Sequence, residues 1–341
     1  MSEDRPGAAP TADFAGQEAW LLDQLGRLGL RLVGPLDREH VRPWATAVRV
    51  PTDAGVLWFK AHTPVLSHEA PVTRVLAQLR ADAVLEVLAS DDDRCWLLTR
   101  DAGDKMRTRI SSVDDLRLLE PVLAAYGDLQ QRAAARVPEL LAAGALDRRS
   151  SRLGELLVAA VRADQLGGVA GQVDPLTPEE HDRLVAAAPA LQALADESAA
   201  IVPDSIEHSD LHDGNVFVRD GAGRVGDFGD SSVSQPLASL VVLQTSLTYR
   251  LGVDPGAPEL HRLYHAALEP WTDRTPMAGL VSLVARVRPI GMLGRALTWR
   301  ALITELGAEQ MREFGDGWSG WARDLLAALE AGADTTRAAQ L

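Results

Sequence analysis

The sequence predicts an α+β fold of two lobes, with a small β-rich N-terminal lobe over residues 1–100 and a larger helical C-terminal lobe over residues 101–341. Within the first hundred residues, apolar and polar residues alternate in short segments, which is typical of strands. From Asp114 onward, apolar residues recur at i, i+3 and i+4, which is typical of helices. A chain of 341 residues, 46% of them hydrophobic, is long enough for two lobes that meet at a cleft.

The first lobe is predicted to be an antiparallel sheet interrupted by one helix. Val72, Leu76 and Leu79 recur at helical spacing, so we expect a helix over residues 68–79. This helix separates the second and third strands, so the chain crosses the sheet at that point. The expected strands cover residues 45–50, 55–61, 83–88 and 94–99.

The second lobe is predicted to be mainly helical. Leu116, Leu119 and Leu123 begin the helical pattern, and a polar island over residues 205–230 interrupts it with strand-like pieces at 216–218 and 224–226. The remaining helices are expected near residues 152–165, 180–199, 236–249, 258–268, 277–306 and 317–329.

Composition restricts the compartment and the partners. The net charge of −14 opposes binding to nucleic-acid phosphates and favours cationic small molecules, although acidic surfaces also serve solubility alone. The single cysteine, Cys95, can form neither an internal disulfide nor a metal cluster. Residues 1–17 lack the anatomy of a signal peptide and are expected to be a frayed tail, and the most apolar stretch, 238–253, is too polar to span a bilayer. We therefore expect a soluble, cytoplasmic protein of open oligomeric state.

The polar island carries the chemistry. It reads His208-Ser209-Asp210-Leu211-His212-Asp213-Gly214-Asn215, then a strand, a turn containing glycine and a second strand that ends in Asp227-Phe228-Gly229. A loop, a strand, a tight turn and a second strand bring the loop and the end of the second strand together. Asp210, Asn215 and Asp227 are therefore expected to face one small volume.

Phosphoryl transfer needs the groups that this island supplies. A carboxylate orients and deprotonates the attacking hydroxyl, and separate oxygen ligands hold Mg²⁺ against the triphosphate. The Asp-x-x-x-x-Asn spacing followed by Asp-Phe-Gly agrees with the catalytic and metal-binding loops of kinases. A polar hairpin with ordinary turn residues would be a simpler interpretation, but it does not explain both spacings together.

These motifs resemble the aminoglycoside phosphotransferase and choline kinase group, the phosphotransferase enzyme family. Its loop reads His-Gly-Asp-Leu-His-x-x-Asn and its metal motif is commonly Asp-Trp-Gly, whereas this chain has Ser209 and Phe228 at the differing positions. The resemblance implies a bilobal, protein-kinase-like fold and an enzyme that uses ATP or GTP with Mg²⁺ to phosphorylate a hydroxyl group of a small molecule. It implies Asp210 as the catalytic base and Asn215 and Asp227 as the metal ligands.

The first lobe offers matching nucleotide-binding residues. Lys60 ends a strand-like run and Glu69 begins the following helix, so the resemblance implies that Lys60 neutralises the phosphates and Glu69 orients it. There is no glycine-rich loop, so phosphate contacts are expected from the backbone near Thr46 and from its hydroxyl. The strand that contains Leu98, followed by residues 100–103, resembles the lobe connection that binds the purine, and Leu98 is assigned there.

The acceptor is not fixed by the sequence. A cationic acceptor would use Asp230 and Glu207, the nearest candidates in sequence, whereas arginines late in the chain favour a neutral or anionic acceptor. Aminoglycosides, macrolides, amino sugars and choline-like alcohols all stay open, and so does the choice between antibiotic resistance and metabolism. The late arginines are Arg286, Arg288, Arg295 and Arg300.

Two functions besides a small-molecule kinase are compatible with a kinase-like fold. A protein kinase would carry an arginine in the catalytic triplet, a glycine-rich loop and an Ala-Pro-Glu motif, and this chain has none of them. A non-catalytic kinase-fold binding module would be expected to lack Lys60, Asp210, Asn215 or Asp227, and all four are present. The small-molecule kinase is therefore the preferred hypothesis.

Overall fold

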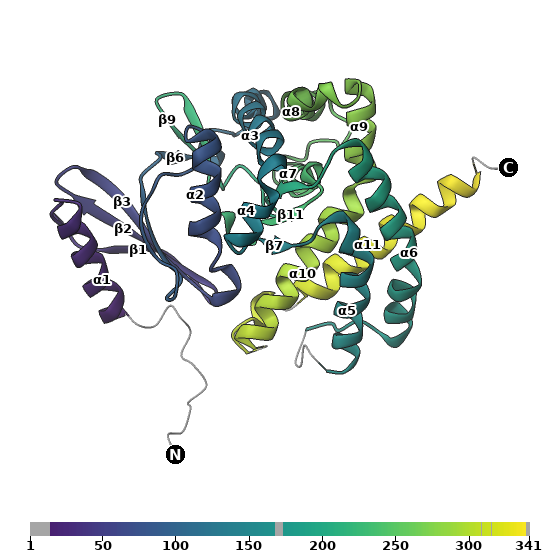
Figure 1. The fold of residues 1–341 in the computed structure, drawn as a ribbon, viewed down its shortest axis with the longest axis horizontal. Helices are drawn as coiled ribbons and strands as arrows, with labels where there is room; N and C mark the ends of the chain where they lie inside the picture. The colour runs from purple at the N-terminus through teal and green to yellow at the C-terminus, as the bar shows by residue number, and fades with distance from the viewer. Residues whose placement is uncertain (1–13, 168–172, 308, 315, 339–341) are drawn as a thin grey trace, which may run out of the picture.

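The N-terminal part of the protein is a five-stranded antiparallel sheet in the order β1-β2-β3-β5-β4 (Figure 1). The structure, a computed structural model, describes residues 14–167, 173–307, 309–314 and 316–338. The strands of this sheet are β1 (Asp37–Arg42), β2 (Ala45–Thr52), β3 (Gly55–His62), β4 (Val87–Asp91) and β5 (Trp96–Arg100).

Two helices lie on opposite faces of this sheet. Helix α1 (Phe14–Arg27) packs Leu21 and Leu25 against Val48, Phe59 and Leu98, while α2 (Glu69–Arg80) lies on the other side (Figure 1). The predicted helix over residues 68–79 is confirmed. The prediction of a frayed tail is wrong from residue 14 onward, because apolar residues spaced along α1 bury themselves on the sheet, and the rest of that tail lies outside the described residues.

The strand predicted over residues 83–88 begins later than expected. Ala83 and Val84 are buried, but they pair with the C-terminal lobe: Val84 bridges to Val225, and Val225 N donates to Ala83 O at 2.8 Å. Their apolar character therefore reflects a contact between the lobes, and β4 starts only at Val87.

The C-terminal lobe is mainly helical, as predicted. The predicted helix over residues 277–306 consists of two helices bent by 43°, because Pro289 in the first turn of the second helix lacks the N–H that would continue the first. The helices are α3 (Glu120–Ala133), α4 (Val137–Ala142), α5 (Leu153–Gln165), α6 (Pro178–Ile201), α7 (Ser239–Leu251), α8 (Pro258–Leu268), α9 (Met277–Arg286), α10 (Arg288–Leu306) and α11 (Gly317–Ala338).

Two small sheets frame the polar island. One has the order β10-β9-β6 and contains the hairpin predicted from the sequence, and the other has the order β7-β11-β8. The loop that follows β8 and the turn that follows β10 thereby lie next to each other. These strands are β6 (Asp104–Lys105), β7 (Leu146–Asp147), β8 (Ser205–Glu207), β9 (Val216–Arg219), β10 (Ala222–Val225) and β11 (Ser232–Ser234).

The segment between the lobes runs from Arg100 to Gly103. Asp101 accepts hydrogen bonds from Trp58 Nε1 at 2.9 Å and from Gly103 N at 3.2 Å, which ties the segment to β3. Gly103 has φ +91°, and a Cβ there would lie 2.3 Å from Val218 O, so only glycine fits. We propose Arg100 as the boundary between the lobes, because the last strand of the five-stranded sheet ends there.

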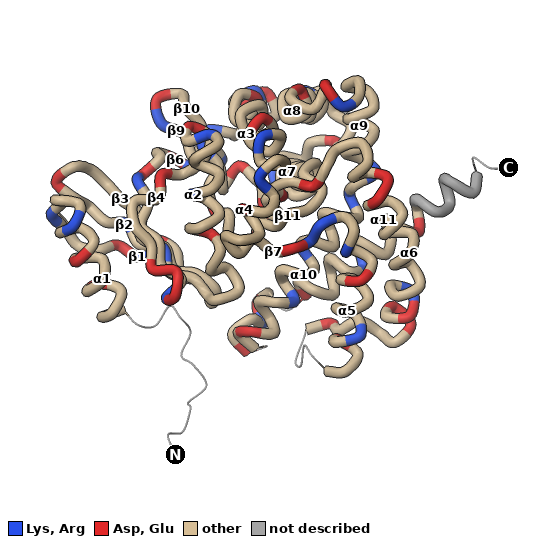
Figure 2. Tube along the Cα trace, viewed as in Figure 1, with Lys and Arg blue, Asp and Glu red and all other residues tan. Residues whose placement is uncertain are grey.

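Charge and hydropathy are distributed as in a packed globular chain. Acidic and basic residues are interspersed over both lobes (Figure 2).

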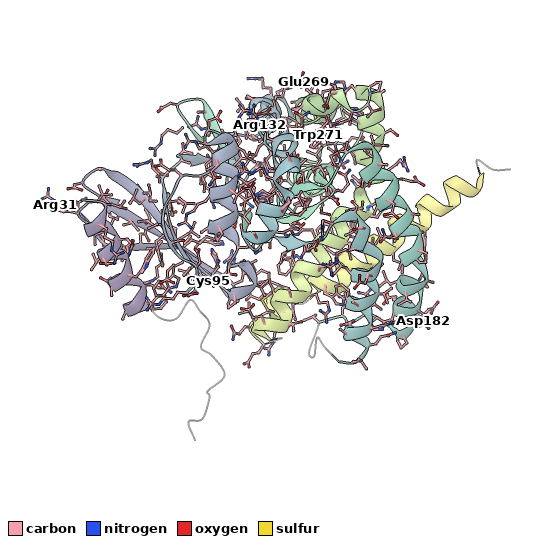
Figure 3. All side chains as sticks on the ribbon, in the orientation of Figure 1. Arg31, Cys95, Arg132, Asp182, Glu269 and Trp271 are labelled. Carbon is pink, nitrogen blue, oxygen red and sulfur yellow. The ribbon has the colours of Figure 1, made fainter. Side chains whose placement is uncertain are left out.

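Among the described residues, α6 is long and apolar enough to cross a membrane by length and composition alone, and the bent pair α9 and α10 would be a second such stretch. Helix α6 packs against α5 and α11 and buries Leu184 and Leu191, while Asp182 lies on its exposed side (Figure 3). Packing within the lobe therefore accounts for these two leucines.

Candidate active site

The loop from His208 to Asn215 brings a carboxylate and a carboxamide together. Asn215 Nδ2 donates to Asp210 O at 3.0 Å and lies 3.3 Å from Asp210 Oδ2. The side chain of Asp210 is 22% exposed, so it is held by protein but open on one side. The structure thus brings Asp210 and Asn215 into contact, as the spacing predicts.

His208 anchors the loop from inside the lobe. It is fully buried, and its Nε2 lies 3.0 Å from the carbonyl of Gly226, so that nitrogen carries the proton and donates. Its other nitrogen accepts from Asp210 N at 3.3 Å, and His208 N donates to Ser239 Oγ at 3.0 Å. His208 therefore joins the loop to the segment that carries Asp227, and its role is structural.

Ser209 and Glu207 act as one unit. Ser209 stands where the family has glycine and adopts φ +59°, a left-handed conformation that serine rarely takes. Ser209 N donates to Glu207 Oε1 at 2.6 Å, the Ser209 hydroxyl donates to Glu207 Oε2, and Ser232 Oγ donates to the same oxygen at 3.3 Å. These bonds hold the strained loop.

The assignment of Glu207 to the acceptor is therefore wrong. The residue is only 3% exposed, and both of its carboxylate oxygens already accept hydrogen bonds from the loop and from β11. A carboxylate that holds the loop from inside the lobe cannot also contact a ligand in the cleft.

Asp213 is a loop anchor that the sequence did not reveal. It is fully buried and forms ion pairs with Arg107, at 3.4 Å, and with Arg250 of α7. Gly214 lies against the same arginine, since a Cβ there would be 2.4 Å from the Arg107 guanidinium. Both partners are far from the loop in sequence, so no local pattern could have predicted the contact.

Lys60, Glu69 and Asp227 form an ion-pair network across the lobes. Lys60 Nζ donates to Glu69 Oε2 at 2.6 Å and to Asp227 Oδ1, and His62 Nε2 lies 3.2 Å from Glu69 Oε2. Burial opposes the charge on Lys60, but Asp227 and Glu69 outweigh it and raise the pKa of the lysine. The structure therefore brings the predicted lysine, glutamate and metal-loop aspartate together.

Asp227 is held as an anion in an uncommon backbone conformation. Burial favours the protonated form, but the Lys60 ammonium outweighs it and keeps the pKa of Asp227 below its usual range. Asp227 has φ +66°, and its side chain is 45% exposed, so the carboxylate is open to a ligand despite the surrounding protein. Left-handed backbone at such a position is typical of a functional site.

Arg295 of α10 links Asp210 to Asp230. Its Nη1 lies 3.0 Å from Asp230 Oδ2 and 3.4 Å from Asp210 Oδ1. Burial raises the pKa of Asp230 to about 6, and the charges of Asp210 and Asp227 add to the rise although Arg295 opposes it. Asp230 is thus near the catalytic loop, as predicted, but it is already paired with a cation.

Thr46 and Leu98 lie away from this network. Ala47 and Leu97 are the residues opposite Lys60 in the sheet, so Thr46 and Leu98 point to the other face, toward α1. Leu98 is fully buried there, and its strand is paired on both sides, by β3 and by β4. The structure therefore does not bring the side chains of these two residues to the site, because both point to the sheet face opposite that of Lys60.

The donor atoms at this site suit Mg²⁺. Within the described part of the chain, the Asn215 amide donates through Nδ2 and Asp227 binds Lys60 through Oδ1, so Asn215 Oδ1 and Asp227 Oδ2 remain as oxygen ligands. Mg²⁺ is commonly held by one or two protein oxygens together with phosphates and water. No group of three or more His, Cys, Asp or Glu side chains in the described ranges could hold a metal ion by itself.

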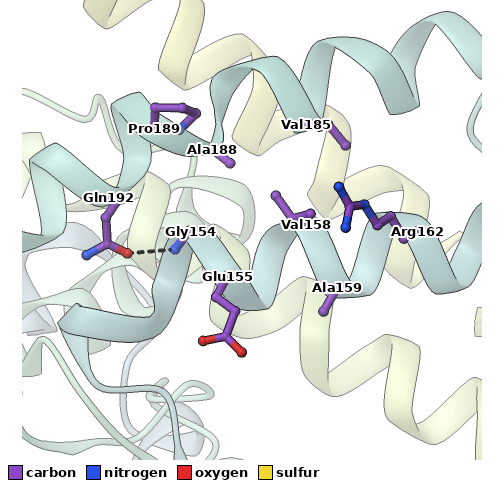
Figure 4. Close-up of a pocket in the computed structure, with 9 residues that line it drawn as sticks. All are labelled: Gly154, Glu155, Val158, Ala159, Arg162, Val185, Ala188, Pro189 and Gln192. Carbon is purple, nitrogen blue, oxygen red and sulfur yellow. Dashed lines mark hydrogen bonds between the residues drawn. The ribbon is translucent and has the colours of Figure 1, made fainter.

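A hollow between α5 and α6 lies apart from these residues (Figure 4). It has a volume of about 460 Å³, and Gly154 N donates to Gln192 Oε1 at one end of it. Its lining contains none of the loop, lysine or metal-motif residues, so it is not the place where phosphoryl transfer would occur.

His68 makes stability depend on pH. It is 4% exposed and its Nε2 donates to Ser231 O at 3.0 Å. Burial, with a smaller contribution from Arg148, lowers its pKa from 6.5 to about 4. The unfolded chain therefore binds a proton that the folded chain does not, so this contribution is complete above pH 6.5 and is lost as the pH falls toward 4.

We expect the His68→Gln variant to lose this pH dependence. Between pH 7 and pH 5, wild type should lose about 2 kcal/mol more of its unfolding free energy than the variant, since each pKa unit corresponds to about 1.4 kcal/mol. Urea unfolding at both pH values measures this difference. His265→Gln, at an exposed histidine, is the control and should behave as wild type. An equal pH response in wild type and His68→Gln would contradict the prediction.

Comparison with known proteins agrees with this geometry. Residues 9–280, more than half of the chain, match the phosphotransferase enzyme family. The chain belongs to that family. The prediction of an enzyme, a phosphotransferase with an alcohol group as acceptor, is thereby confirmed, and so is the family resemblance. No curated protein sequence matches this phosphotransferase.

Solved structures share the fold of this phosphotransferase. A macrolide 2'-phosphotransferase type I is 18% identical, with 91% of this chain and 97% of that chain covered and a TM-score of 0.56. An ethanolamine kinase from Plasmodium vivax is 10% identical, with 92% and 85% covered and a TM-score of 0.60. An aminoglycoside phosphotransferase in a ternary complex with streptomycin and ATP is 11% identical, with 89% and 98% covered and a TM-score of 0.52. The prediction of a protein-kinase-like α+β fold is confirmed.

Proposed function

We propose that this phosphotransferase uses a Mg²⁺-nucleotide, ATP or GTP, to phosphorylate a hydroxyl group of a small-molecule acceptor. The observation that carries the proposal is that two pairs of side chains, supplied by both lobes, lie at one site. Lys60 and Asp227 form one pair across the lobes, and Asp210 and Asn215 form the other within the loop. A lysine, a metal-binding oxygen pair and a carboxylate that accepts the proton of the hydroxyl are the groups that phosphoryl transfer needs.

Each group has a distinct task in this proposal. Asp210 accepts the proton of the acceptor hydroxyl and orients its oxygen toward the γ-phosphate. Lys60, aligned by Glu69, neutralises the phosphate oxygens. Asn215 and Asp227 would hold Mg²⁺, which balances the charge that develops on the transferred group. The products are the nucleoside diphosphate and a phosphate ester.

Within the connection that the sequence indicated for the nucleotide base, residues 100–103 are better placed than Leu98. The segment from Arg100 to Gly103 leaves the sheet next to β3. Among the described residues, the N–H groups of Asp101 and Ala102 have no hydrogen-bond partner, whereas the backbone of Leu98 is used by two neighbouring strands. We therefore assign purine recognition to this connecting segment. We place the activity in the cytoplasm, where nucleotide and Mg²⁺ are abundant and Cys95 stays a thiol (Figure 3).

Nucleoside diphosphate release tests the proposal. The purified protein is mixed with Mg²⁺ and either ATP or GTP, and with a panel of hydroxylated compounds that includes sugars, amino sugars, macrolides, aminoglycosides and amino alcohols. We expect at least one acceptor to stimulate release in a Mg²⁺-dependent manner. Binding of nucleotide without release for any acceptor would favour a non-catalytic kinase-fold module instead.

A further inference from the structure

Arg295 lies beside Asp210, the base in the proposed function. It projects from α10, is 8% exposed and contacts both Asp210 and Asp230, at 3.4 and 3.0 Å. A guanidinium stays charged under all ordinary conditions. Burial opposes that charge, but Asp210 and Asp230 outweigh it and raise the pKa of Arg295. Both carboxylates nearest the reacting hydroxyl are therefore already neutralised by one fixed cation.

A second arginine holds α10 in this position. Arg148 is 6% exposed and donates to Gly294 O and to Thr298 Oγ1, both on α10 and both at 2.9 Å. Gly294 precedes Arg295, so the two hydrogen bonds fix the helix turn that presents it. The placement of Arg295 is thus built into the lobe.

The two carboxylates that the sequence suggested for a cationic acceptor, Glu207 and Asp230, are not free to bind one. Both carboxylate oxygens of Glu207 accept hydrogen bonds from Ser209 of the loop, and the carboxylate of Asp230 is paired with Arg295. An ammonium group at this position would have to displace the guanidinium, leaving a buried arginine without partners, or would have to sit beside it at the cost of like-charge repulsion. Either arrangement weakens the binding of a polycation.

The same surface offers groups that suit an uncharged acceptor. Arg295 Nε is buried, and it has no hydrogen-bond partner among the described residues. One helical turn later, Trp299 lies 5.7 Å from the Arg295 guanidinium and packs on Trp44 of the hairpin between β1 and β2, with ring centroids 5.5 Å apart. Aromatic faces pack on apolar rings and also attract cations, so the discrimination against ammonium groups rests on the guanidinium, whose N–H groups donate to oxygen and whose charge repels a second cation.

We propose that Arg295 determines the acceptor class, so that the site takes a neutral, hydroxylated acceptor and rejects polycations such as aminoglycosides. The inference rests on the proposed phosphotransferase function, but its test measures binding and does not depend on turnover. It replaces the cationic acceptor that the net charge suggested, because the charge of the whole surface does not describe the pocket.

Calorimetric binding of neomycin, a polycation, tests the proposal in the presence of Mg²⁺ and a non-hydrolysable ATP analogue. Arg295→Gln frees Asp210 and Asp230, so we expect it to bind neomycin about tenfold or more tightly than wild type, with the gain lost at high salt. Arg295→Lys keeps the charge and should show no gain. Adding Asp230→Asn to Arg295→Gln should reduce the gain, because one of the freed carboxylates is removed.

Arg300→Gln is the matched control. Arg300 lies on the same helix, has a buried Nε without a partner among the described residues and stacks 6.0 Å from Trp318, but it is not paired with Asp210 or Asp230. Arg300→Gln changes the net charge by the same amount as Arg295→Gln. Its affinity for neomycin should stay within about twofold of wild type, as for most substitutions outside a binding site. A gain in Arg300→Gln equal to that in Arg295→Gln would assign the effect to net charge alone.

Two results would overturn the proposal. One is tighter binding of neomycin than of its fully N-acetylated, uncharged derivative by wild type, which is decisive even if Arg295→Gln fails to fold. The other is the absence of a gain in a folded Arg295→Gln, as judged by its melting temperature. Failure of the proposed function would appear separately, as no nucleoside diphosphate release with any acceptor while these affinities remain measurable.

Discussion

Asp210→Asn should lower kcat by about 10²–10⁴-fold, the usual contribution of a general base, while nucleotide affinity stays close to that of wild type. The carboxylate contacts Asn215, Arg295 and His212, but it is not one of the oxygens assigned to Mg²⁺. Asparagine has the same shape and cannot accept the proton of the hydroxyl. Nucleoside diphosphate release and nucleotide binding, measured on the same preparation, separate the two effects.

Asp220→Asn provides the control for this variant. Asp220 is exposed in the turn between β9 and β10, close in sequence to the loop but outside the site. It makes the same chemical change and should leave kcat unaltered. A large loss of nucleotide affinity in Asp210→Asn with little change in rate would mean that the roles of Asp210 and Asp227 are exchanged.

The regular parts of the fold could be predicted because burial and periodicity agree in them. Strands β2 and β3 alternate buried and partly exposed residues along their length, and α8 has the predicted bounds 258–268. Strand β1 could not be predicted, since all six of its residues are exposed and most are charged. Its pairing with β2 depends on backbone hydrogen bonds at a sheet edge, which leave no hydrophobic pattern.

The residues of the candidate site likewise fall into those that the sequence could identify and those that it could not. Lys60, Glu69, Asp210, Asn215 and Asp227 belong to motifs whose spacing is local, and the structure brings them together. The contacts of Glu207, Asp213 and Arg295 involve partners that lie far away in sequence or on another element. Sequence identifies such residues as charged but cannot show whether a partner already neutralises them. The side chains of Thr46 and Leu98 point toward α1, which the sequence could not show, because alternation gives the period of a strand and not the face that meets the cleft.

Asp227→Asn should abolish the dependence of nucleotide binding on Mg²⁺ and lower turnover on the order of 10³-fold or more, since stabilisation by a bound metal ion is worth several kcal/mol. Asparagine is the informative replacement, because it tolerates the φ of +66° at this position, whereas alanine would add backbone strain to the loss of the ligand. Lys60 would keep Glu69 as its partner, so the lysine should stay in place. The readout is nucleotide affinity across a Mg²⁺ titration, together with kcat.

The control for Asp227→Asn is again Asp220→Asn, because Asp220 also has a left-handed backbone, with φ +52°. The two variants make the same chemical change in the same backbone region and differ in whether the carboxylate lies beside Lys60. Wild type and Asp220→Asn should bind nucleotide more tightly as Mg²⁺ rises, while Asp227→Asn should give a flat titration. Near-normal activity, or an unchanged Mg²⁺ response in a folded Asp227→Asn, would rule out Asp227 as a metal ligand and leave Lys60 as its only functional contact.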